Sequence, residues 1–107
     1  MFIMSSIFTK IINREVPCKM EYEDDDLIVI HDINPKAPLH LLIVPKEEIK
    51  TVDDLSHEHS ALIAKMFFVA QDMAKKHELA GYKLQFNVHE KGGQEVPHVH
   101  MHLLGYK

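Results

Sequence analysis

Three histidines that alternate with apolar residues near the end of this 107-residue chain constrain its fold most strongly. The stretch runs from residue 96 to 106; its histidines are His98, His100 and His102, and the apolar residues between and after them are Val99, Met101 and Leu103. A two-residue period is that of a β-strand, so the pattern predicts the three imidazoles on one face and the apolar side chains on the other. Imidazoles two residues apart on a strand are about 6.6 Å from each other. Such a row suits an extended anionic ligand, for example a nucleotide phosphate with its leaving group, better than one metal ion.

The composition limits the class of protein. The chain is 46% hydrophobic and carries a net charge of −4, which fits a globular domain and argues against broad electrostatic capture of nucleic acid. Cys18 is the only cysteine, so an intrachain disulfide and a cysteine-based metal cluster are excluded. The sequence has neither a signal-peptide pattern nor an apolar run of membrane-spanning length. We therefore expect one domain over residues 1–107, in the cytoplasm, with neither nucleic acid nor membrane as partner.

Apolar spacing predicts two helices and five strands. A short helix capped by Ser5 or Ser6 runs through Ile12, and one long helix begins at Ser56 and stops at Gly81. The long helix is expected to bury one stripe, made of Leu62, Ile63, Met66, Phe67, Ala70, Met73 and Ala74. The expected strands are residues 20–23, 27–30, 39–44, 82–88 and 96–106. The last two of these form a hairpin with a long connection that contains Gly92 and Gly93.

Four motifs, in order along the chain, resemble the histidine triad superfamily and, within it, the Hint branch. They are Ser6–Ile12 followed by Glu15–Pro17, His31–His40, Asn87 with Gly92–Val96, and His98–Leu104 with its His-φ-His-φ-His-φ-φ pattern, φ being apolar. The resemblance implies an α+β fold with an antiparallel sheet, one long helix and one short helix, the sheet continuing across a homodimer. It also implies hydrolysis of purine nucleoside phosphoramidates, in which AMP or GMP is bonded through nitrogen to an amine, by way of a covalent nucleotidyl-histidine intermediate. No metal or other cofactor is required by this scheme.

The resemblance also implies roles for individual residues. His100 attacks the α-phosphorus, His102 contacts the phosphate or assists the leaving group, and His98 and His40 hold the geometry of the site. Asp32 binds the ribose hydroxyls. The wall of the base pocket is formed by Ile7, Phe8, Ile11, His31 and Ile33, and the phosphate-facing positions are Asn87, Gly93, Gln94, Glu95 and Val96. An ionised Glu95 has no proton to donate, so only its backbone N–H is expected to contact phosphate.

The chemistry sets one further requirement. A nucleophilic imidazole must present a lone pair, so its other nitrogen should donate to a fixed acceptor such as a backbone carbonyl.

The residues also leave four alternative interpretations open. They are a histidine strand that merely packs, a metal site made of two triad histidines and His40, a diadenosine polyphosphate hydrolase, and a nucleotide-binding regulatory module with little turnover.

Overall fold

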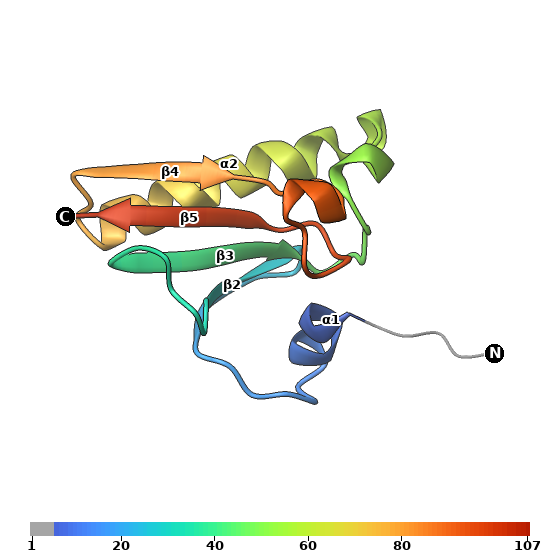
Figure 1. Cartoon of the computed structure of the whole chain (residues 1–107), viewed down its shortest axis with the longest axis horizontal. Coiled ribbons are helices and arrows are strands. Elements are labelled where there is room, and N and C mark those ends of the chain that lie inside the picture. The colour runs from blue at the N-terminus through green and yellow to red at the C-terminus, as the bar shows by residue number, and fades with distance from the viewer. Residues whose placement is uncertain (1–5) are drawn as a thin grey trace.

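The computed structural model describes residues 6–107 as a five-stranded antiparallel sheet with a helix on each face (Figure 1). The strands are β1 (Met20–Glu23), β2 (Leu27–His31), β3 (Leu39–Pro45), β4 (Gly81–Gln85) and β5 (Met101–Tyr106). They lie in the order β1-β2-β3-β5-β4, and every neighbouring pair is antiparallel. The expected α+β fold with one long and one short helix is confirmed. In the described part of the chain, no helix is long and apolar enough to cross a membrane.

The long helix, α2 (Ser60–Lys76), covers one face of the sheet. Its buried side chains recur at helical spacing and pack against alternate residues of the central strands: Met66, Val69, Ala70 and Met73 against Leu27, Val29, Leu41, Ile43, Met101 and Leu103. Phe67, predicted to be in this stripe, is 44% exposed, because Met66 and Val69 take the inward positions and turn its side chain away. The prediction that Phe67 belongs to the buried stripe is therefore wrong.

Both predicted ends of α2 are also wrong. The Ser56 side chain caps a short 3-10 turn (His57–His59), and the α-helix begins only at Ser60. The helix ends at Lys76, because Glu78 takes a left-handed φ of 52° and the N–H of Leu79 donates back to the carbonyl of Ala74. Gly81, the predicted stop, is instead the first residue of β4. Two further 3-10 turns cover Val52–Asp54 and Glu90–Gly92.

The short helix, α1 (Ile7–Ile12), covers the opposite face. Its buried Phe8 and Ile11 pack against Ile28, Ile30, Leu42 and Val44, which alternate along β2 and β3 with the residues under α2. The Ser6 hydroxyl accepts the N–H of Thr9 at 3.1 Å, so Ser6 is the cap. Ser5, the other predicted cap, lies outside the described residues.

The histidine strand is shorter than its pattern predicts. Residues 96–100 are irregular because Pro97 has no N–H, the N–H of His98 turns back to the carbonyl of Val96, and Val99 donates to Ile49. Regular pairing starts at Met101, and β4 likewise ends at Gln85 rather than at Val88. The alternation itself is confirmed: the residues buried under α2 are Val99, Met101 and Leu103, and the three histidines contact the other face.

Candidate active site

Four histidines gather on the α1 face, where β3 and β5 pair. His40 comes from β3, His102 from β5, and His98 and His100 from the irregular segment before β5. The ring centroids of His100 and His102 are 4.9 Å apart, and those of His40 and His102 are 5.2 Å apart. The Phe8 ring of α1 meets the His100 ring edge to face at 4.9 Å. The structure thus brings together the four histidines that the sequence predicts for one site.

His98 is fully buried and has both ring nitrogens satisfied. Its Nε2 lies 2.7 Å from the carbonyl oxygen of Pro45, which can only accept, so Nε2 carries the proton. Burial lowers the pKa of His98, which leaves the ring neutral and Nδ1 bare. The Ser6 hydroxyl, 2.6 Å away, therefore donates to Nδ1. These two bonds fix the tautomer and the orientation of the ring.

One ring nitrogen of His100 is left as a lone pair. Its Nδ1 lies 2.7 Å from the carbonyl oxygen of His98 and must donate to it, so Nε2 is bare when the ring is neutral. Burial lowers the pKa of His100 against the opposing effects of the His98 carbonyl and of the Asp32 and Glu95 carboxylates. The backbone carbonyl that the chemistry requires is thus present.

The protonation of His102 is set by a chain that begins at a backbone amide. The N–H of Lys36 donates to His40 Nδ1 at 3.1 Å, so the neutral His40 ring carries its proton on Nε2. That Nε2–H donates to His102 Nδ1 at 2.9 Å, which leaves the His102 proton on its own Nε2. Within the described chain this buried Nε2 has no hydrogen-bond partner. Burial, followed by the neighbouring His100 and His40, lowers the pKa of His102 to about 4.

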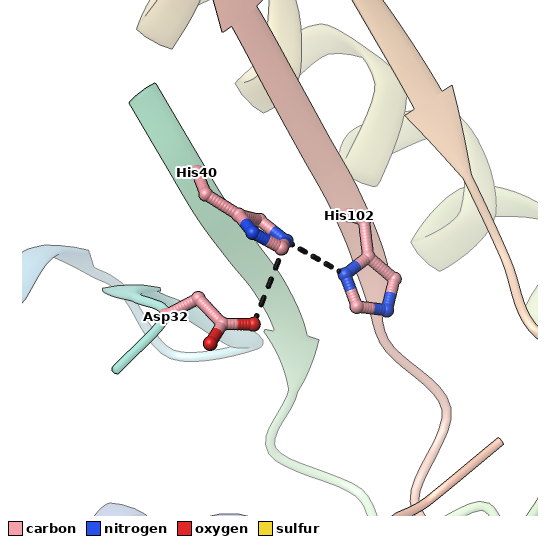
Figure 2. A group of neighbouring side chains, drawn as sticks. All are labelled: Asp32, His40 and His102. Atoms are coloured by element: carbon pink, nitrogen blue, oxygen red, sulfur yellow. Dashed lines mark hydrogen bonds and ion pairs between the residues drawn. The ribbon is translucent and has the colours of Figure 1, made fainter. Parts of the chain in front are cut away.

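Asp32, His40 and His102 form a compact group of metal-ligand types (Figure 2). Their nearest ligand atoms all lie within 4.8 Å of one another, and Asp32 Oδ2 is 3.5 Å from His40 Nε2. A metal bound there needs lone pairs on both His40 Nε2 and His102 Nδ1. His40 would then carry its proton on Nδ1, where the N–H of Lys36 already points. The donor set therefore fits a hydrogen-bonded chain and does not fit a metal ion.

Asp32 and the nearby apolar residues border this group. Asp32 Oδ1 accepts the N–H of Asn34 at 2.8 Å, while Oδ2 faces His40. Ile33 is 90% exposed and Ile7 is 42% exposed, so both have surface free for a ligand. Phe8 and Ile11, predicted for the same pocket wall, lie in the core beneath α1.

The structure does not bring the His31 imidazole to this group. His31 follows Ile30 on β2, and because side chains alternate along a strand its ring lies on the α2 face. There its Nε2 bonds Glu21 Oε2 at 2.8 Å, and His77 bonds the other Glu21 oxygen at 2.6 Å. The hydrogen bond made by the His31 ring is thus on the α2 face, away from the four histidines.

In the connection that contains Gly92 and Gly93, most of the polar groups form hydrogen bonds with other groups of the protein. Gly93, at a φ of 89°, donates to Glu90, and the N–H of Gln94 donates to His89. The Gln94 amide donates to the carbonyls of Lys50 and Val96, and Asn87 Nδ2 donates to the carbonyl of Gly93 at 3.3 Å. Glu95 is exposed, and Val96 packs against the core beneath α1. These bonds shape the loop edge and leave few of its predicted phosphate donors free.

Sequence reasoning misses the groups that set the histidine tautomers. They are the Lys36 N–H, the Pro45 carbonyl and the Ser6 hydroxyl, with Glu48 behind Ser6. Ser6 is predictable as a helix cap, but its bond to His98 spans 92 residues and leaves no local signal.

Comparison with known proteins assigns the family. Residues 5–107 match the family model described as "Scavenger mRNA decapping enzyme C-term binding". The chain is 47% identical over 102 residues to the purine nucleoside phosphoramidase of Escherichia coli, covering 94% of this chain and 86% of that protein. Among solved structures, a HIT family hydrolase from Legionella pneumophila has a TM-score of 0.93 at 42% identity, covering 96% of this chain and 94% of that one. A HIT family hydrolase from Clostridium thermocellum has a TM-score of 0.93 at 39% identity, covering 99% and 94%. With four histidines gathered as its sequence pattern predicts, the chain belongs to the histidine triad family.

Proposed function

We propose that this protein hydrolyses purine nucleoside phosphoramidates, in which AMP or GMP is bonded through nitrogen to an amine. One observation carries the proposal: the His100 ring, whose Nε2 is bare, and the His102 ring, whose Nε2–H has no hydrogen-bond partner among residues 6–107, lie with their centroids 4.9 Å apart. A nucleophile and a donor side by side suit the cleavage of a phosphorus–nitrogen bond. The similarity to a protein named purine nucleoside phosphoramidase supports the substrate class.

The reaction takes two steps. The lone pair on His100 Nε2 attacks the α-phosphorus, and the phosphorus–nitrogen bond to the amine breaks as that nitrogen gains a proton. A neutral imidazole avoids the repulsion that an anionic nucleophile meets at an anionic phosphate. The Nε2–H of His102 donates to the phosphate oxygens or to the leaving nitrogen. Water then attacks the phosphorus, the bond from phosphorus to His100 Nε2 breaks, and the nucleoside monophosphate is released. The proton lost by the water replaces the one given to the leaving nitrogen, so both histidines return to their starting state. No cofactor takes part.

The placement of the other residues supports the remaining proposed roles. Asp32 Oδ2 accepts the ribose hydroxyls, because its other oxygen is held by Asn34. Ile7, Ile33 and the backbone of His31 contact the base, and Phe8 and Ile11 support that wall from the core. The phosphate side of the site is bordered by Asn87, Gly93, Gln94, Glu95 and Val96, of which the backbone N–H of Glu95 contacts the phosphate. His98 and His40 hold the two central rings.

A homodimer is part of the same proposal. β4 is an edge strand that pairs only with β5 among the described strands, and most of its side chains are exposed. Phe67 and Phe68 on α2 and Tyr82 on β4 are also exposed. Natural proteins cover or pair such edges, and pairing with β4 of a second copy continues the sheet. The whole of residues 1–107 acts as one domain, in a reducing cytoplasm where Cys18 stays a thiol.

The direct test compares substrates. Purified protein is given adenosine and guanosine phosphoramidates and, separately, diadenosine polyphosphates, with His100→Ala as the contamination control. Phosphoramidate turnover that exceeds polyphosphate turnover and disappears in the variant is the expected result. Preferred cleavage of the polyphosphates, or no turnover of either class, would contradict the proposal.

A further inference from the structure

Glu48 lies outside the residues that touch the proposed substrate, yet it holds the start of α1. Its Oε1 accepts the backbone N–H of Ser6 at 2.7 Å and the hydroxyl of Thr9 at 2.6 Å. The first turn of α1 has no acidic residue of its own, so a distant segment supplies the carboxylate that a helix N-terminus favours. The bond from Thr9, followed by that from Ser6, lowers the pKa of Glu48.

The hydroxyl protons of Ser6 and Thr9, which both contact Glu48 or its hydrogen-bond partners, have one consistent assignment. Ser6 gives its only hydroxyl proton to His98 Nδ1, and its oxygen accepts the N–H of Thr9. The Thr9 hydroxyl proton therefore goes to Glu48 rather than to Ser6. Each of these donors has an acceptor, so a continuous set of hydrogen bonds connects Glu48 to His98.

Ser6, Thr9 and Glu48 are connected to His100 through two contacts. The first is the carbonyl of His98, which receives the Nδ1 proton of His100 at 2.7 Å. The second is Phe8, the second residue of α1, whose ring contacts His100 at a centroid distance of 4.9 Å and His98 at 5.7 Å. Movement of the start of α1 would loosen both the acceptor of the His100 proton and the ring packed against it.

We propose that Glu48 is a positioning residue for His100. By anchoring Ser6 and Thr9 it holds the His98 carbonyl and the Phe8 ring in the places that orient the His100 imidazole. The kinetic consequence rests on the proposed function, whereas the orientation of His100 is measurable without any substrate.

The chain offers a matched control at the preceding position. Glu47 is also exposed, and its carboxylate pairs with His59 at 3.2 Å rather than with α1. Glu48→Ala removes the anchor, Glu47→Ala removes an equal charge, and Glu48→Gln keeps an oxygen that accepts both bonds. Thr9→Val removes one of the two bonds with little change of shape, and it serves if Glu48→Ala folds poorly.

Two readouts are recorded for each variant: the imidazole nitrogen and proton resonances of His100 by NMR, and kcat and KM for an adenosine phosphoramidate. In Glu48→Ala we expect the His100 Nδ1–H signal to exchange faster and its two nitrogens to shift toward a mixture of tautomers. We expect kcat to fall about tenfold, since small misplacement of a reacting group is costly, and KM to change less. Glu47→Ala and Glu48→Gln should resemble the wild type, and Thr9→Val should lie between.

If Glu48→Ala and Thr9→Val lower only thermal stability and leave the His100 resonances as in Glu47→Ala, the positioning role is overturned. A wild type with the expected His100 tautomer but no phosphoramidase activity would instead contradict the proposed function. The NMR comparison of Glu48→Ala with Glu47→Ala would still decide the role of Glu48.

Discussion

The two pairs of histidines in the site are held in different ways. In the His98–His100 pair, both ring nitrogens of His98 are hydrogen-bonded, and the Nδ1–H of His100 donates to the backbone carbonyl of His98. In the His40–His102 pair, hydrogen bonds run in one direction from the Lys36 amide and end at a buried N–H that has no partner among residues 6–107. Such an orphaned donor is costly in a protein interior. We therefore propose that the first pair orients the nucleophile and that the second donates a hydrogen bond to the substrate.

The largest effect is expected from His100→Ala. Removal of the proposed nucleophile should lower turnover by roughly a thousandfold or more, while nucleotide binding changes far less because the proposed base and ribose contacts come from other segments. Steady-state rates and calorimetric AMP binding measure the two separately. Near-normal turnover in a contaminant-free preparation would remove His100 from its proposed role.

His102→Ala should slow phosphoramidate hydrolysis by about a hundredfold, as the loss of a proton donor commonly does. The loss should shrink for a substrate whose leaving group departs without a proton, such as a nitrophenyl ester of AMP. Paired rate measurements on the two substrates check this dependence. An equal loss on both would mean that His102 stabilises the phosphate alone.

His98→Ala should act mainly on stability. It leaves the Ser6 hydroxyl and the Pro45 carbonyl unpaired and opens a cavity in the core, so the free energy of unfolding should fall by about 2–4 kcal/mol. Urea denaturation of His98→Ala and His102→Ala measures the difference. A smaller loss in His98→Ala than in His102→Ala would reverse the contrast between the two pairs.

The smallest effect is a dependence of stability on pH. The four site histidines have lowered pKa values when folded, that of His102 falling from 6.5 to about 4. The unfolded chain therefore binds more protons below pH 6.5, and the free energy of unfolding decreases as the pH falls from 6.5 toward 4. Denaturation at pH 7, 6 and 5 checks this, with a shallower decrease expected for His102→Ala. A flat profile above pH 5 would contradict the lowered values.

The sequence predicted the face of each triad side chain because a two-residue period survives even where strand pairing fails. It misplaced the start of the strand, since pairing of Val99 with Ile49 is a contact between distant segments. His31 adjoins Asp32 in sequence, yet its ring points to the other face and bonds Glu21. The bond from Glu48 to Ser6 spans 42 residues, so no local pattern could reveal it. The period of apolar residues therefore predicts which face of the sheet a side chain occupies, whereas hydrogen bonds between distant segments determine the tautomers of the site histidines.

The central claim is that the bare Nε2 of His100 attacks phosphorus. Wild-type protein quenched during turnover of a substrate labelled at the α-phosphate, then digested and mapped, tests it directly. Acid-labile, base-stable label on His100 is the predicted result, as for a phosphorus–nitrogen bond. Label on His98 or His102, or none under conditions where the intermediate accumulates, would contradict the account.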